Sequence, residues 1–221
     1  RLGPKRACTQ GWITLYAMRV GIIVTTVLSC LVGLPLVLFG GWNMVLIGAL
    51  CVLFCFLYTT RLSYIGLGDV LVLLFFGVVP VCVTYCLVIP ASYNVISYDV
   101  VWMSIACGLM IDTLLVVNNY RDIENDRRAG KRTLVVFLGK KASRYLYILL
   151  GLAACSICVT ILFVRGNVLT FLPVTVLPFL FVSYHKIVKI GHGRQLNVVL
   201  GETARNIFIF GLIAAFSIIF G

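Results

Sequence analysis

The sequence predicts an all-α integral membrane protein that crosses the bilayer several times. Of its 221 residues, 62% are hydrophobic and only 11% are charged, whereas a soluble domain carries about 25% charged residues. The mean hydropathy is +1.10. Several apolar runs approach the ~20 residues that an α-helix needs to span the hydrocarbon core. We therefore treat residues 1–221 as a single polytopic membrane domain.

The apolar runs predict seven transmembrane helices, at about 18–39, 43–59, 70–90, 99–119, 143–164, 168–186 and 204–220. The second is short for a full span. Gly33 and Pro35 are expected to kink the first helix, and Pro80 the third, because proline removes a helical hydrogen bond. Pro90 marks a further irregular point. Neighbouring helices can satisfy the backbone groups that such kinks release.

The basic residues predict the orientation of these helices. Every Lys and Arg except Arg165 falls on connections of one side. The members of this set are Arg1, Lys5, Arg6, Arg19, Arg61, the eight basic residues from Arg121 to Arg144, Lys186, Lys189, Arg194 and Arg205. The positive-inside rule makes that side cytoplasmic. The N-terminus is then expected inside and the C-terminus outside.

The nine cysteines are interpreted as structural. Most fall inside predicted spans, where cysteine usually acts as a small hydrophobic residue. Cys155 and Cys158 have CxxC spacing, but no His or acidic residue accompanies them in that helix.

The stretch "NNYRDIENDRRAGKRT", residues 118–133, holds three of the seven acidic residues. If the fourth helix continues to about Arg127, then Asn118, Asp122 and Asp126 recur at i, i+4 and i+8 and share one face. Mg²⁺ prefers oxygen ligands and commonly bridges one or two carboxylates to substrate phosphates. Orientation does not explain this row, because acidic residues contribute little to it. The competing interpretation is a charged loop without a ligand.

Basic residues surround the acidic row. Arg121, Lys131 and Arg132 could meet phosphate oxygens, because Arg binds them in a bidentate manner and Lys acts as a point charge. For the basic residues taken alone, topology is the favoured explanation, because the positive-inside rule already accounts for them.

A second polar connection reads "YTTRLSYIGLGD", residues 58–69. Asp69 could cap the next helix, whereas Tyr58, Arg61 and Tyr64 suit a substrate with an anionic head and a ring. Asp112 lies within the predicted fourth span. An ionisable residue there either faces a wet cavity or is a protonated packing group, and both interpretations stay open.

"NNYRDIENDRRAGKRTL" resembles the second aspartate-rich motif of the UbiA superfamily of membrane prenyltransferases. Together with "YIGLGD", "RLGPKRA" and "GRQLNVVLGETAR", it resembles the branch that prenylates 1,4-dihydroxy-2-naphthoate for menaquinone. The resemblance covers essentially the whole chain. It implies a ring of nine helices around a central cavity. Two Asp-rich motifs at the cytoplasmic helix ends would hold Mg²⁺ and an isoprenyl diphosphate.

The resemblance assigns roles to the residues singled out above. Asn118, Asp122 and Asp126 would be metal ligands, with Asp122 and Asp126 catalytic. The residues expected to bind the diphosphate are Arg61, Arg121, Lys131 and Arg132. Those expected to bind substrate are Tyr58, Tyr64 and Asp69.

The expected reaction transfers a polyprenyl chain from polyprenyl diphosphate to 1,4-dihydroxy-2-naphthoate with loss of CO₂, at the cytoplasmic face of the inner membrane. One alternative is another aromatic acceptor, 4-hydroxybenzoate or haem. A second is a cation-coupled transporter that uses Asp112 and the acidic row. No nucleic-acid partner is expected.

The sequence departs from the family pattern in two ways. The first Asp-rich motif is absent, and seven helices are predicted where the family implies nine. We therefore expect the chain to be N-terminally incomplete and inactive alone. Phe137 also stands where relatives usually have Arg.

Overall fold

The computed structural model describes residues 2–3, 7–89 and 96–221, and this part contains helices and no strand. Seven helical segments are long and apolar enough to cross a membrane, which confirms the predicted fold class. Arg1, Lys5, Arg6 and Pro90 lie outside the described residues.

The first and third spans are interrupted where proline was expected to act. α1 (Leu15–Gly33) continues through the 3₁₀ turn η1 (Leu34–Leu36) into α2 (Val37–Gly40), and α3 (Trp42–Thr60) returns. After the 3₁₀ turn η2 (Leu62–Tyr64), the third span consists of α4 (Gly68–Val72), the π-helical segment η3 (Leu73–Val78) and α5 (Val79–Val88). Pro35 lies within η1, and Pro80 is the second residue of α5, just after η3. Proline has no backbone N–H to donate, and a π-helical segment adapts the helix to the missing hydrogen bond.

The other four spans are α6 (Tyr98–Arg128), α7 (Leu134–Val164), α8 (Leu177–Ile190), which follows the 3₁₀ turn η4 (Leu172–Val176), and α9 (Leu196–Phe220). α6 extends well past the predicted end near 119. α7 and α9 begin before the predicted 143 and 204. Our boundaries were wrong because the first two turns of α7 and α9 carry charged residues such as Lys140 and Glu202. The apolar pattern marks only the lipid-embedded part of each helix. Gly139, with φ 75°, kinks α7.

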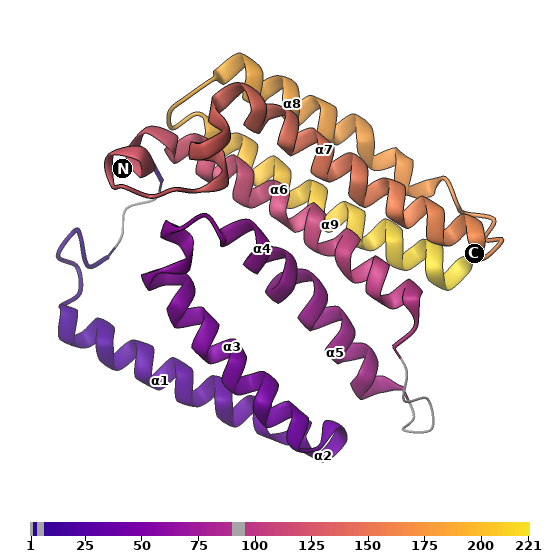
Figure 1. The fold of residues 1–221 in the computed structure, drawn as a ribbon, viewed down its shortest axis with the longest axis horizontal. Coiled ribbons are helices and arrows are strands. Elements are labelled where there is room, and N and C mark those ends of the chain that lie inside the picture. The colour runs from indigo at the N-terminus through magenta and orange to yellow at the C-terminus, as the bar shows by residue number, and fades with distance from the viewer. Residues whose placement is uncertain (1, 4–6, 90–95) are drawn as a thin grey trace.

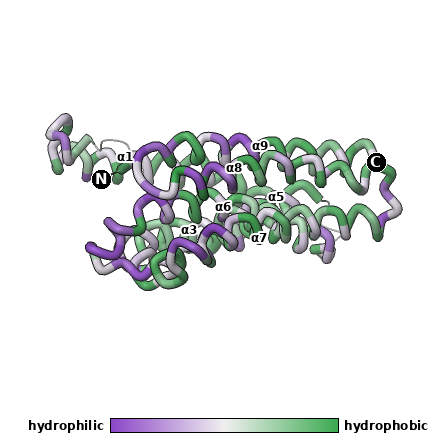
Figure 2. Tube along the Cα trace, turned by 90° about the horizontal axis from the view of Figure 1, so that it is seen from above, coloured by the Kyte–Doolittle hydropathy of each residue, from purple (hydrophilic) through white to green (hydrophobic). Residues whose placement is uncertain are grey.

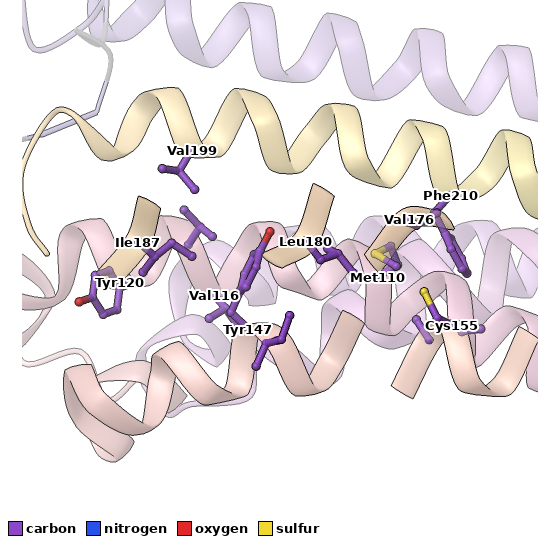
Figure 3. Close-up of a cluster of buried hydrophobic side chains, with 14 of the residues drawn as sticks. Met110, Val116, Tyr120, Tyr147, Cys155, Val176, Leu180, Ile187, Val199 and Phe210 are labelled. Atoms are coloured by element: carbon purple, nitrogen blue, oxygen red, sulfur yellow. The ribbon is translucent and has the colours of Figure 1, made fainter. Parts of the chain in front are cut away.

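α6, α7, α8 and α9 form the packed core, as Figure 3 shows for its labelled side chains. Tyr120, Tyr147, Leu180 and Phe210 are at most 1% exposed there. In Figure 1, α1 and α3 stand apart from these helices, on the far side of α4 and α5. α1, α2 and α3 contain no buried residue. Their exposed apolar side chains suit contact with lipid.

Hydrophilic segments gather at one end of the molecule, the end where Figure 2 places the N-terminus. The C-terminus lies at the opposite end (Figure 1), as an odd number of spans requires. All nine cysteines are free, and Cys155 and Cys158 are buried in the core, in agreement with their structural interpretation.

Candidate functional site

The acidic row lies on one helix face. Asn118, Asp122 and Asp126 all belong to α6, and all three line one cavity of about 730 Å³. The extension of α6 to Arg128 therefore gives the i, i+4, i+8 arrangement that the spacing predicted.

The end of α6 folds the chain back over this cavity. The backbone N–H of Lys131 donates to the carbonyl of Asp126 at 2.9 Å, and Gly130 has φ 71°. This is the backbone conformation that glycine supplies after a helix. The Lys131 Nζ then lies 3.7 Å from Asp126 Oδ1. A cation is thereby placed beside the row.

The two predicted polar connections meet. The backbone N–H of Arg132 donates to the carbonyl of Tyr64 at 2.8 Å. Gly66 has φ 88°, and a Cβ there would lie 2.7 Å from the Arg132 carbonyl oxygen, so only glycine fits without a shift. The Lys131 Nζ is 5.1 Å from the centroid of the Tyr64 ring, which is within cation–π range. One wall of the cavity is therefore built from segments 61–67 and 129–133.

Several predicted residues share this cavity and others do not. Tyr58, Tyr64, Asp69 and Lys131 line it together with the acidic row. Arg61 and Arg132 are exposed and do not line it, so their contact with diphosphate stays a prediction. Sequence reasoning missed six other polar lining residues: Thr9, Thr59, Ser63, Asn119, Asn125 and Thr133. The signal for Asn125 was its position one turn from Asp122.

Arg121 lies behind the acidic row and does not line the cavity. Its guanidinium donates to both Asp122 oxygens, at 3.1 and 2.5 Å, and to Asn118 Oδ1 at 2.8 Å. It also donates to Asn197 Oδ1 of α9 at 2.8 Å. Arg121 is only 6% exposed. The arginine therefore fixes the orientation of two predicted metal ligands and ties α6 to α9.

Asp69 does not cap α4. The N-cap residue is Leu67, which makes no side-chain capping hydrogen bond, and Asp69 lies in the first turn. Its carboxylate can still favour the helix dipole, but it opens to the cavity.

A second cavity, of about 680 Å³, adjoins the first. Its lining is mostly apolar and includes Phe54, Phe75 and Leu114. The two cavities have four lining residues in common: Tyr58, Thr59, Leu115 and Asn118. The site thus combines a polar, charged compartment with an apolar one.

The donor set of the polar cavity fits a hard cation that keeps part of its water shell. Asn118, Asp122 and Asp126 offer one amide and two carboxylates on one wall. Within the described residues, no group of three or more His, Cys, Asp or Glu is placed to hold a metal. These donors could hold a hard cation that takes its remaining ligands from water or a bound molecule.

Comparison with curated proteins gives several relatives named 1,4-dihydroxy-2-naphthoate octaprenyltransferase. The chain is 36% identical over 166 residues to a protein of Escherichia coli (strain K12) named 1,4-dihydroxy-2-naphthoate octaprenyltransferase. This match covers 70% of the chain and 53% of the relative. The Haemophilus influenzae protein of that name is 35% identical, covering 70% and 52%. The Mycobacterium tuberculosis protein is 28% identical, covering 100% and 75%.

The chain spans about half the length of the first two relatives. No solved structure matches it. The model of the UbiA prenyltransferase family matches residues 2–212. Since this match covers nearly all of the chain, including both polar connections, six spans and most of the seventh, the chain belongs to the UbiA prenyltransferase family.

Proposed function

We propose that the protein transfers a polyprenyl chain from polyprenyl diphosphate to 1,4-dihydroxy-2-naphthoate, with loss of CO₂, as a step of menaquinone synthesis. The observation that carries the proposal is the junction of the two cavities. A polar compartment with carboxylates and a lysine suits a metal-bound diphosphate. The adjoining apolar compartment suits a long hydrocarbon chain.

The polar cavity would hold the head of the donor. Asn118, Asp122 and Asp126 would hold Mg²⁺, which would neutralise charge that develops on the departing diphosphate. Lys131 lines the same cavity and would contact phosphate oxygens as a point charge. Preorganised groups of this kind stabilise the transition state because they need no reorganisation during the reaction.

The apolar cavity would hold the tail and keep water away from the reacting carbon. Leu115 and Tyr58 line both cavities, so the allylic carbon would lie near them. Both relatives that match at 35% identity or more carry 1,4-dihydroxy-2-naphthoate in their names, which favours this acceptor over 4-hydroxybenzoate or haem.

The protein would act in the bacterial inner membrane with its site at the cytoplasmic face. The basic residues that surround the polar cavity support this orientation. Single cysteines introduced at Arg128 and Arg165 would test it, since a membrane-impermeant thiol reagent should label only the second from outside intact cells.

The central experiment supplies the complete protein in membranes with Mg²⁺, polyprenyl diphosphate and one of two acceptors, 1,4-dihydroxy-2-naphthoate or 4-hydroxybenzoate. Prenylated, decarboxylated naphthoate product that disappears on addition of EDTA is expected. Product from 4-hydroxybenzoate alone would contradict the acceptor, and product that survives metal removal would contradict the metal site.

A further inference from the structure

Two buried carboxylates have no role in the donor site described above. Asp112 is 4% exposed and Asp69 is 8% exposed. Within the described part of the chain, both carboxylate oxygens of Asp69 lack a hydrogen-bond partner, and so does Oδ1 of Asp112. Burial of a polar group without a partner costs free energy. Such groups in a native fold indicate a function or a ligand.

Close packing of two helices brings these carboxylates to face each other. A Cβ on Gly77 would lie 2.7 Å from the Ser104 carbonyl oxygen, and a Cβ on Gly108 would lie 2.8 Å from that of Leu73. The third span and α6 run antiparallel, and each contact is one helical turn from the last. The next turn of this register places Asp69 opposite Asp112.

The pair lies beside the polar cavity. Asp69 lines the polar cavity, and Tyr58 lines both cavities. Asp112 lines neither cavity and stands behind Asp69. Two carboxylates that share a site resist double ionisation and are most stable with one proton between them.

We propose that Asp69, backed by Asp112, accepts the hydroxyl proton of the aromatic acceptor as its ring attacks the prenyl chain. The inference rests on the proposed function and names the acceptor end of the same site. Asp69 is the catalytic residue that touches the acceptor, and Asp112 is a positioning residue that acts through it.

The proton and the electrons balance. The C–O bond of the donor breaks, and its electron pair leaves with the diphosphate. A ring carbon of the acceptor supplies the pair for the new C–C bond, and the hydroxyl proton moves to the carboxylate pair. The ring carboxylate then leaves as CO₂, and its bonding electrons restore the aromatic ring. The two aspartates return the proton to the ring oxygen.

The test uses Asp69→Asn in the complete protein with saturating Mg²⁺ and donor. General acid–base catalysis contributes roughly 10²–10⁴-fold, so kcat is expected to fall by about that factor, with metal-dependent binding of a non-reactive polyprenyl thiodiphosphate unchanged. Asp112→Asn should cause a smaller loss, and the double variant should be no slower than Asp69→Asn. Asp99→Asn is the matched control, because Asp99 is paired with Arg165 at the far end of α6.

An acceptor analogue with both hydroxyls methylated has no proton to give. The parent protein should prenylate it slowly, and Asp69→Asn should slow it no further. An unchanged kcat in Asp69→Asn, or an equal slowing of the methylated analogue, would overturn the proposal. Loss of donor binding would also overturn it, because Asp69 would then belong to the metal site.

A separate variant tests the proposed function itself. If that function is wrong, Asp122→Asn will leave donor binding intact. Thermal unfolding of each variant separates misfolding from catalysis.

Discussion

Arg121 supports the acidic row from behind, so its removal should destabilise the protein as well as impair the site. Arg121→Met keeps an aliphatic chain but removes every hydrogen bond of the guanidinium. Asp122 would lose two hydrogen bonds and its counter-charge, while Asn118 and Asn197 would each lose one. The Asp122 side chain is only 16% exposed, so water replaces little of this.

Removal of one partner of a buried ion pair costs about 3–5 kcal/mol. The remaining exposure of Asp122 to the cavity favours the lower end, about 3 kcal/mol. Since about 1 kcal/mol shifts Tm by roughly 2–4 °C in a chain of this size, Tm should fall by about 6–12 °C.

Thermal unfolding of the complete protein in detergent, followed by far-UV circular dichroism, measures this shift. Arg128→Met is the matched control: Arg128 is exposed and forms no ion pair within the described part of the chain, so its Tm should move by under about 2 °C. The double variant Arg121→Met/Asp122→Asn removes the unpaired charge and should recover at least half of the loss. If Arg121→Met unfolds with the control, or if the double variant is less stable than the single one, the guanidinium does not support the row.

Three further outcomes are expected in the complete protein. Asp126→Ala should lower turnover by about 10²–10³-fold without a loss of folded protein, and near-normal turnover at saturating Mg²⁺ would show that this carboxylate is not a ligand. Gly66→Ala should cost about 1–3 kcal/mol, because the left-handed conformation and the close Arg132 carbonyl both oppose a Cβ; a Tm equal to that of the parent would contradict the joined wall. Leu115→Trp should narrow the junction and slow long donors more than short ones, whereas Leu149→Trp, at a site that is 58% exposed, should not discriminate between donor lengths.

The local features of the site could be predicted from sequence. The spacing of Asn118, Asp122 and Asp126 is a property of one helix, so periodicity alone placed them on a shared face. The transmembrane spans could be predicted equally well, because a run of about 20 apolar residues identifies each of them. Pro35 and Pro80 also marked the helix interruptions correctly, since proline acts on its own backbone.

Contacts between distant segments could not be predicted in the same way. Arg121 was expected to contact diphosphate, but in the structure its guanidinium bonds Asn197, which is 76 residues away. Nothing in the local pattern distinguishes an arginine that faces a cavity from one that supports its wall. The bond between Arg132 and Tyr64 likewise depends on how the third span packs against α6. The facing of Asp69 and Asp112 required the helix register, which only the close glycine contacts revealed.

The absence of buried residues in α1, α2 and α3 has a consequence for biogenesis. A chain synthesised from its N-terminus places these helices in the bilayer before α6 leaves the ribosome. Each early span must then be stable in lipid without the core, and the hydropathies of 2.5 and 2.0 for the first two meet this need. Assembly can follow as a separate stage of helix association. The polar cavity, whose lining comes from residues 58–69 as well as from α6, is complete only at that stage.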